Sequence, residues 1–172
     1  MMPRVALAAV AWCFVFAVAH IFWALGGSAG LASSAGADLA ARRPAAFVIL
    51  GLWGVAGLLL GAAVAIVAVA TGRFGSRGVW AIGIVGSGLL VRGVALEVVL
   101  ATDTGGIRAA VGPLETRWSL LLWNPWFVLG GALFIGTGVL LLERVRTAKL
   151  SQEPADPHTV GPGHASDEPD RR

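Results

Sequence analysis

The sequence predicts an all-α protein built as a four-transmembrane-helix bundle with a disordered C-terminal tail. Hydrophobic residues make up 56% of the 172 residues and charged residues only 13%, against about 25% charged residues in an ordinary soluble domain. Four apolar runs also reach the length of about 20 residues that a helix needs to cross a hydrocarbon core. We therefore expect residues 1–148 to form the membrane domain and residues 149–172 to form a cytoplasmic tail.

The four expected spans cover residues 5–25, 45–70, 79–101 and 125–142. The first span follows Met-Met-Pro-Arg and so resembles a secretory signal peptide. Its apolar stretch of about 21 residues is longer than an h-region of about 7 to 15 residues, which favours a retained span. For the fourth span, Asn124 is expected to cap the helix and Pro125 to take its first position.

The connections between the spans differ in length and character. Residues 26–44 are rich in Gly, Ser and Ala and end in Arg42-Arg43-Pro44, where we expect no helix. Residues 71–78 form a short turn, whereas residues 102–124 are long enough to lie along the membrane surface or to cover the mouth of a cavity. Beyond the last span the chain is rich in proline and charge, so His158 and His164 are expected to be solvated.

Basic residues indicate the orientation, because positive flanks stay in the cytoplasm. The side with both termini carries six of them and the other side carries four, namely Arg4, Arg73, Arg77, Arg144, Arg146 and Lys149 against Arg42, Arg43, Arg108 and Arg117. The sequence therefore predicts a multi-pass protein of the cell membrane with both termini cytoplasmic.

Composition excludes several classes of protein. Cys13 is the single cysteine and lies in the first span, so neither an intrachain disulfide nor a Cys-x-x-Cys redox pair can form. The basic residues are scattered between apolar segments, which argues against nucleic-acid binding. Arg accounts for nearly all of them, and together with the abundant Ala, Gly and Val this usage suggests a bacterial genome of high GC content.

Glycines mark the faces along which the spans are expected to touch, because small residues let helix backbones approach closely in lipid. Gly57 and Gly61 have Gly-x-x-x-Gly spacing in the second span, and the third and fourth spans contain further glycines. The sequence leaves open whether these faces pack within one chain or form a homo-oligomer.

Two charged residues interrupt the third span, where an arginine costs about 2.5 to 3.5 kcal/mol on insertion scales. Glu97 lies four residues after Gly93 and eleven after Gly86, so it shares their helix face and should point into the bundle. Arg92 lies five residues before Glu97, about 140° round the helix. Each charge is therefore expected to need a partner from another helix.

Other polar residues fall in the same half of the membrane. With residues 15 and 90 as span centres, His20 lies about 7 Å, Arg92 about 3 Å and Glu97 about 10 Å toward the outer side, where Asn124 begins the fourth span. These four residues are our candidate lining of a polar cavity. Its candidate rim consists of tryptophans suited to a membrane interface, Trp23, Trp118, Trp123 and Trp126.

A structural interpretation stands beside this functional one. His20 belongs to a helical stripe with Trp12, Phe16 and Trp23, which is typical of packing. Arg92 and Glu97 would serve equally well in an intramembrane ion network, and the tryptophans as interface anchors.

Two short motifs resemble a known family. His20-Ile-Phe-Trp23-Ala-Leu-Gly26-Gly27 and, much later, Trp123-Asn-Pro125-Trp-Phe-Val-Leu-Gly130-Gly131 resemble small bacterial, largely actinobacterial, four-span membrane proteins known as a domain of unknown function. A His-x-x-Trp-x-x-Gly-Gly signature ends their first helix. The resemblance covers residues 5–142, implies an integral membrane protein and assigns no activity, cofactor or catalytic residue.

Three classes of function remain. The first is a non-enzymatic protein that binds a small molecule or lipid headgroup in an outward-facing polar cavity, or serves as an accessory membrane component. The second is a small transporter or transporter subunit acting as an oligomer, for which the similar segments 22–27 and 126–131 suggest an internal repeat. The third is an intramembrane acid/base enzyme using His20 and Glu97, although the sequence has no nucleophile motif and no second intramembrane histidine. Membrane lipids, a small-molecule or lipid ligand and a second copy of the chain are the expected partners; no cofactor or metal is expected.

Overall fold

The computed structural model describes residues 2–150, with side chains through residue 147. All regular elements in this part of the chain are helices, and four of them are long and apolar enough to cross a membrane. The predicted all-α class with four membrane-crossing helices is therefore confirmed. From residue 151 onward the expected tail, including His158 and His164, lies outside the described residues.

The first half of the chain contains two long helices joined by two short ones. Its elements are α1 (Arg4–Ala24), α2 (Leu31–Ala35), α3 (Ala37–Arg42), the π-helical η1 (Phe47–Gly54) and α4 (Val55–Ala70), and η1 and α4 form one continuous span. The short helices lie where we expected none, because a segment rich in Gly and Ser has little helix signal of its own. Tertiary hydrogen bonds hold this segment. Trp23 Nε1 donates to the Ala29 carbonyl at 2.7 Å, and the Arg43 guanidinium donates to the carbonyls of Trp23 and Gly27.

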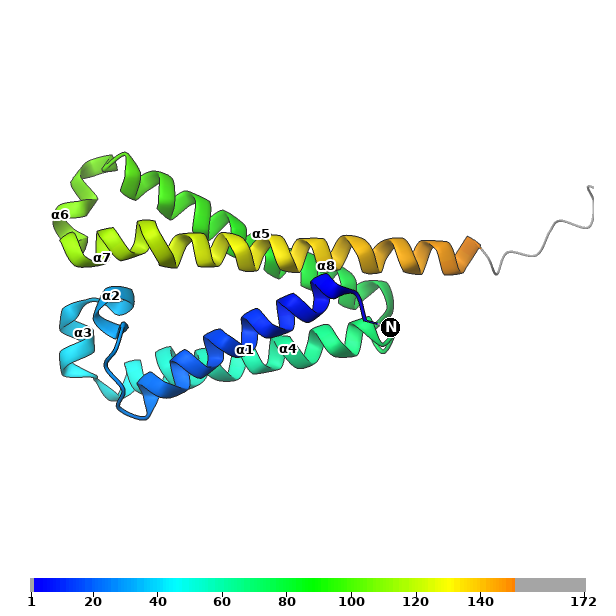
Figure 1. The fold of residues 1–172 in the computed structure, drawn as a ribbon, viewed down its shortest axis with the longest axis horizontal. Helices are drawn as coiled ribbons and strands as arrows, with labels where there is room; N and C mark the ends of the chain where they lie inside the picture. Colours follow the sequence, from blue (N-terminus) through cyan, green and yellow to red (C-terminus); the bar gives the residue numbers. More distant parts are fainter. Residues whose placement is uncertain (1, 151–172) are drawn as a thin grey trace, which may run out of the picture.

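The second half repeats this order of helices and adds one 3-10 turn. These are α5 (Gly75–Ala101), the 3-10 turn η2 (Thr104–Gly106), α6 (Ile107–Val111), α7 (Pro113–Trp118), the π-helical η3 (Ser119–Trp123) and α8 (Asn124–Leu150). The start of α1 and the end of α8 lie at one end of the molecule, the terminal end (Figure 1). The helices α2, α3, α6 and α7 lie at the opposite end, the short-helix end (Figure 1).

The two halves form a structural repeat. In each, a long helix leads to a five-residue helix, a glycine, a six-residue helix, a π-helical segment and a second long helix. Gly36 and Gly112 are 76 positions apart and share a backbone conformation with positive φ, 89° and 92°, which residues other than glycine rarely adopt. Because α1 and α5 both run toward the short-helix end, the repeats are parallel (Figure 1). The similar segments 22–27 and 126–131 are not this repeat, since one ends α1 and the other begins α8.

The fourth span begins earlier than the sequence suggested. The helix runs from Pro113 through η3 into α8, and Asn124 has helical φ and ψ of −67° and −45°. The expected helix start at Asn124 is therefore wrong. Pro125 lacks the N–H that would bond one turn back, and the π-helical segment just before it lets the helix continue past the proline.

Glycines bring α5 and α8 into backbone contact. A Cβ added at Gly131 would lie 2.6 Å from the Leu90 amide nitrogen, and one at Gly86 would lie 2.9 Å from the Ile135 amide nitrogen. By contrast, Gly57 and Gly61 of α4 have no atom within 4 Å of an added Cβ. Within one chain, the expected packing through glycine thus holds for α5 with α8 and is not formed by the Gly-x-x-x-Gly pair of α4.

Two helix pairs make up the bundle, α1 with α4 and α5 with α8, and they meet mainly along α1 and α8. A buried apolar core that includes Ala9, Cys13, Ile66, Val79 and Phe134 joins the pairs toward the terminal end. Toward the short-helix end the pairs diverge (Figure 1). The apolar core therefore joins the helix pairs at the terminal end, and the pairs lie farther apart at the short-helix end.

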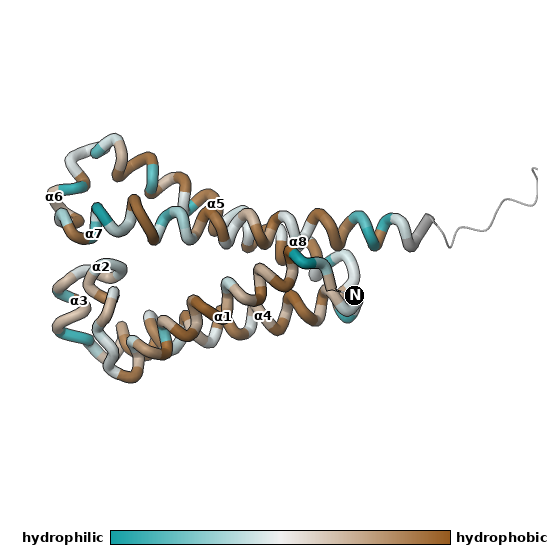
Figure 2. Tube along the Cα trace, viewed as in Figure 1, coloured by the Kyte–Doolittle hydropathy of each residue, from teal (hydrophilic) through white to brown (hydrophobic). Residues whose placement is uncertain are grey.

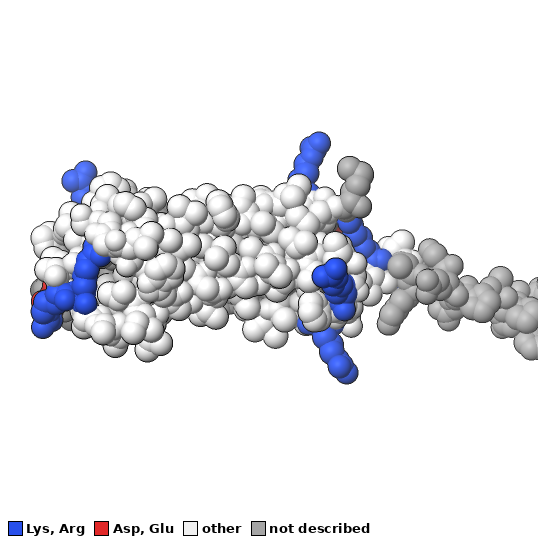
Figure 3. Space-filling view, turned by 90° about the horizontal axis from the view of Figure 1, so that it is seen from below, with Lys and Arg blue, Asp and Glu red and all other residues white. Residues whose placement is uncertain are grey.

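The surface has the pattern of a membrane protein. Apolar residues dominate the long helices, while hydrophilic ones concentrate near their ends (Figure 2). On the face shown in Figure 3, the basic side chains lie at the two ends and leave an uncharged band between them. This band matches the region in which the four spans run side by side.

Candidate functional site

A cavity of about 340 Å³ lies between the two helix pairs at the short-helix end. It is called the polar cavity here because six polar side chains line it, namely His20, Ser34, Arg92, Glu115, Ser119 and Asn124. Aromatic side chains complete much of the wall, namely Phe16, Trp23, Phe47, Trp123 and Phe127. Every long helix or its π-helical extension contributes to this lining, and α2, α6 and α7 cover it from the end.

His20 of α1 is buried and held in one orientation. Its Nδ1 lies 2.8 Å from the Phe16 carbonyl oxygen, and because a carbonyl only accepts, Nδ1 is the donor. The ring packs edge-on against Phe16 and Trp23, with centroid distances of 4.6 Å and 5.1 Å. The other nitrogen, Nε2, makes no hydrogen bond with the described residues and is available as an acceptor in the neutral ring.

Arg92 of α5 lines the same cavity from the opposite helix pair. Its Cζ lies 3.7 Å from the centroid of the Phe127 ring, a cation–π contact with α8. Within residues 2–147 it forms no ion pair or hydrogen bond, so its five N–H donors are not used by this part of the chain.

Glu97 lies beside the polar cavity and does not line it. Its Oε2 accepts a hydrogen bond from Asn124 Nδ2 at 3.2 Å, and Asn124 is only 2% exposed. The glutamate thus faces α8, as the glycine face of α5 indicated. Both charged residues in the middle of α5 contact α8: Glu97 contacts the Asn124 amide, and Arg92 contacts the Phe127 ring.

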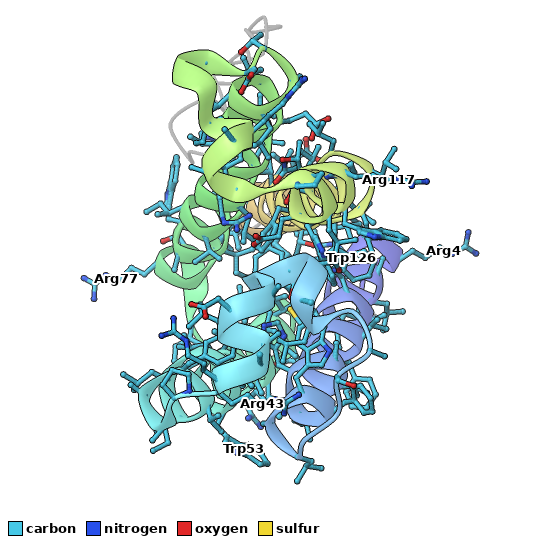
Figure 4. All side chains as sticks on the ribbon, turned by 90° about the vertical axis from the view of Figure 1, so that its left-hand side faces the viewer. Arg4, Arg43, Trp53, Arg77, Arg117 and Trp126 are labelled. Carbon is cyan, nitrogen blue, oxygen red and sulfur yellow. The ribbon has the colours of Figure 1, made fainter. Side chains whose placement is uncertain are left out.

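The four candidate rim tryptophans are distributed over three places. Trp23 and Trp123 line the polar cavity and pack against each other with a centroid distance of 5.9 Å. Trp118 is 41% exposed and lies in a shallow groove outside it. Trp126 stacks on Trp12 of α1, with a centroid distance of 5.7 Å, and accepts a hydrogen bond from it through its carbonyl. Trp126 therefore lies between α8 and α1, where it seals this side of the bundle (Figure 4).

Glu115 was missed as a candidate. It lies on α7, lines the polar cavity and also lines a second hollow between the two sets of short helices. Its carboxylate borders Gly36 of the other repeat, 3.2 Å from the position of an added Cβ. A charge in a connecting segment is ordinary, so nothing in the sequence distinguished Glu115 from Asp103 or Arg117. The structure places it where the cavity meets the short-helix end.

Two arginines at the short-helix end stabilise the fold through hydrogen bonds to the backbone. Arg43 donates to carbonyls at the end of α1, and Arg108 donates to the Leu100 and Ala101 carbonyls at the end of α5. Both arginines thus donate to carbonyls in the last turn of a long helix or just after it, where helical backbone bonding ends. Figure 4 looks onto this end and shows Arg117 extending away from the helices. Arg92 is thus the cation that lines the polar cavity.

The chemistry of the polar cavity suits binding of a polar group. It offers a guanidinium, an imidazole nitrogen, hydroxyls and a carboxylate inside aromatic walls. Within the described residues, no three His, Cys, Asp or Glu side chains lie close enough together to hold a metal ion.

Comparison with known proteins shows one family. No curated protein and no solved structure matches the chain. A family model matches residues 13–134, a range that contains every residue lining the polar cavity. The chain therefore belongs to the family described as "Protein of unknown function (DUF3995)".

Proposed function

We propose that this is a multi-pass protein of the cell membrane whose polar cavity faces outward and binds a small molecule or a lipid headgroup. The observation that carries the proposal is the cavity itself. His20, Arg92 and Asn124 come from three different long helices, yet all three line one space of about 340 Å³. Small-molecule sites occupy roughly 300 to 1,000 Å³ and combine apolar walls with a few polar groups.

Energetics support a binding role over packing alone. A helix bundle in lipid gains stability from close packing and loses it when charges enter the membrane. Within residues 2–147, Arg92 has a cation–π contact with Phe127 and no ion pair or hydrogen bond, and the cavity next to it is not filled by side chains. A site that holds a ligand accounts for both features.

The distribution of basic residues supports the orientation. The terminal end carries more Lys and Arg than the short-helix end, from which we infer that both termini are cytoplasmic. The short-helix end, and the polar cavity with it, then faces outward.

Native mass spectrometry of the full chain in lipid nanodiscs tests the proposal, because it weighs any molecule that stays bound. We expect wild type to retain a bound species that His20→Ala loses. Phe14→Ala is the matched control, since it also removes a ring from α1 but at a position that is 57% exposed and outside the cavity. Circular dichroism verifies that both variants remain helical. Equal retention by the two variants, or no retained species in wild type, would contradict the proposal.

A second candidate function is transport, which the parallel structural repeat favours. Several transporters consist of two parallel repeats with the substrate site between them. Here the polar cavity lies between the repeats, and the apolar core closes the terminal end. Mass measurement in detergent tests the oligomeric form of this idea, because a strictly monomeric protein would count against a transporter that needs two copies to enclose a path.

A further inference from the structure

We propose that the ligand of the polar cavity is a lipid with an anionic headgroup, which enters sideways from the bilayer between η1 and α5 and binds Arg92. This inference rests on the proposed binding role of the cavity and names its ligand class. The shared chemistry is a phosphate or carboxylate group, and the source we favour is the outer leaflet.

The charge of the ligand follows from Arg92. This residue lies nine positions before the end of α5, or about 14 Å along the helix, and so within the apolar part of the span. Arg92 forms no ion pair with a carboxylate of residues 2–147: Glu97 bonds to Asn124 instead, and the Glu115 carboxylate, which lines the same cavity, lies against Gly36. A guanidinium in this position is stabilised by an anion, and its fork of donors matches phosphate and carboxylate oxygens.

The route of entry follows from an asymmetry of the bundle. On the α1–α8 side, Trp12 and Phe16 of α1 pack against Trp123 and Trp126, with ring centroids 5.7 Å to 6.4 Å apart across the seam. These ring contacts join α1 to α8 along this side of the cavity. On the opposite side η1 packs on α1 and α4, and α5 packs on α8, so η1 and α5 face each other across the cavity.

The side chains at this opening suit a lipid. Arg92, Leu96 and Leu100 follow one another at four-residue intervals along α5 and all line the cavity. Arg92 and Leu96 are exposed, whereas Leu100 is 5% exposed beneath the short helices. Phe47 and Leu52 of η1 lie across from them. A cation beside an apolar stripe is complementary to a headgroup with its acyl chain.

The short-helix end, which faces water, also favours a ligand that comes from the bilayer. Glu115 lies where the polar cavity meets the hollow between the short helices, with its carboxylate against Gly36. A negative charge at this mouth repels a small anion that approaches from water. An anionic lipid that arrives through the bilayer avoids it.

Native mass spectrometry of the full chain tests the inference by lipid competition. The protein is reconstituted into vesicles of phosphatidylcholine with an equal amount of phosphatidylglycerol, and the retained lipids are counted. We expect wild type to prefer phosphatidylglycerol by about ten-fold. Both lipids carry the same phosphate, but the choline cation of phosphatidylcholine repels the Arg92 guanidinium, whereas phosphatidylglycerol is a net anion. Arg92→Gln should abolish the preference, Arg92→Lys should keep part of it, and Arg117→Gln should leave it unchanged, because Arg117 extends away from the cavity (Figure 4).

A second variant keeps the test decisive if Arg92→Gln does not fold. Leu96→Trp retains the charge and narrows the space between η1 and α5, so it should lower phosphatidylglycerol retention. Retention of phosphatidylglycerol unchanged in both variants would overturn the inference. If inorganic phosphate displaced the bound lipid as readily as added lipid does, entry of the ligand from the bilayer would be contradicted. If wild type retained both lipids equally and His20→Ala retained neither, the ligand would not be specifically anionic, but the cavity would still be a binding site. If wild type retained no molecule, both the anionic ligand and the binding function would be contradicted.

Discussion

Replacing Gly131 with alanine should separate α5 from α8 and destabilise the protein. The new Cβ would lie 2.6 Å from the Leu90 amide nitrogen and 2.8 Å from the Gly86 carbonyl oxygen, both backbone atoms that cannot rotate away. Ordinary contacts begin at 3.4 Å, so the two helices must move apart by about 0.8 Å at this point. Overpacking of this kind costs about 1 to 3 kcal/mol.

The helix propensity of alanine offsets part of this cost. Glycine to alanine gains up to about 1 kcal/mol in a helix interior, which leaves a net loss of up to about 2 kcal/mol for Gly131→Ala. Gly88→Ala on α5 is the matched control, because an added Cβ there has no atom within 4 Å. Equilibrium unfolding in mixed micelles measures both. Equal stability of the two variants would refute the close α5–α8 contact.

Three further substitutions test the arrangement around the polar cavity. Arg43→Gln should lower the free energy of unfolding by about 2 kcal/mol, because it removes donors to several carbonyls. Arg42→Gln should change the free energy of unfolding little, since Arg42 forms an exposed ion pair. Equal effects of the two substitutions would contradict the anchoring role of Arg43. Gly36→Ala should lower the melting temperature because of its φ of 89°, at a cost of about 1 to 3 kcal/mol, and an unchanged melting temperature would count against this backbone conformation. Asn124→Leu should lower the free energy of unfolding by about 1 to 3 kcal/mol, because it leaves the Glu97 carboxylate without its donor. A double-mutant cycle with Glu97→Gln should show a coupling energy between the two positions. Additive effects would contradict the contact between the two side chains.

The spans were predictable because hydrophobicity over about 20 residues depends on the sequence window alone. His20 and Arg92 were predictable as candidates for a related reason, since a polar residue in an apolar span is conspicuous before any packing is known. The side of α5 that carries Glu97 also followed from the glycines at four- and eleven-residue intervals before it.

The side-chain contacts between helices were not predictable, because they depend on the relative orientation of the packed helices. That Asn124 donates to Glu97, and that Phe127 rather than a carboxylate meets Arg92, is fixed by the α5–α8 contact, which no single helix specifies. Local rules also misled at Asn124, whose Asn-Pro pair is typical of a helix start but here lies inside a continuous helix. Glu115 lies in a connection where charged residues are common, so only the fold distinguishes it.

Cysteine accessibility tests most directly whether an open polar cavity lies between the two repeats. Cys13 is buried and is the single cysteine, so Cys13→Ala provides a background without thiols. In that background Ser119→Cys lies in the cavity lining, and Ser87→Cys lies on the exposed surface of α5 away from it. A membrane-impermeant thiol reagent added outside intact cells should modify Ser119→Cys and leave Ser87→Cys, which faces lipid, unmodified. Ser119→Cys that stays as unreactive as Ser87→Cys would contradict an outward-facing cavity.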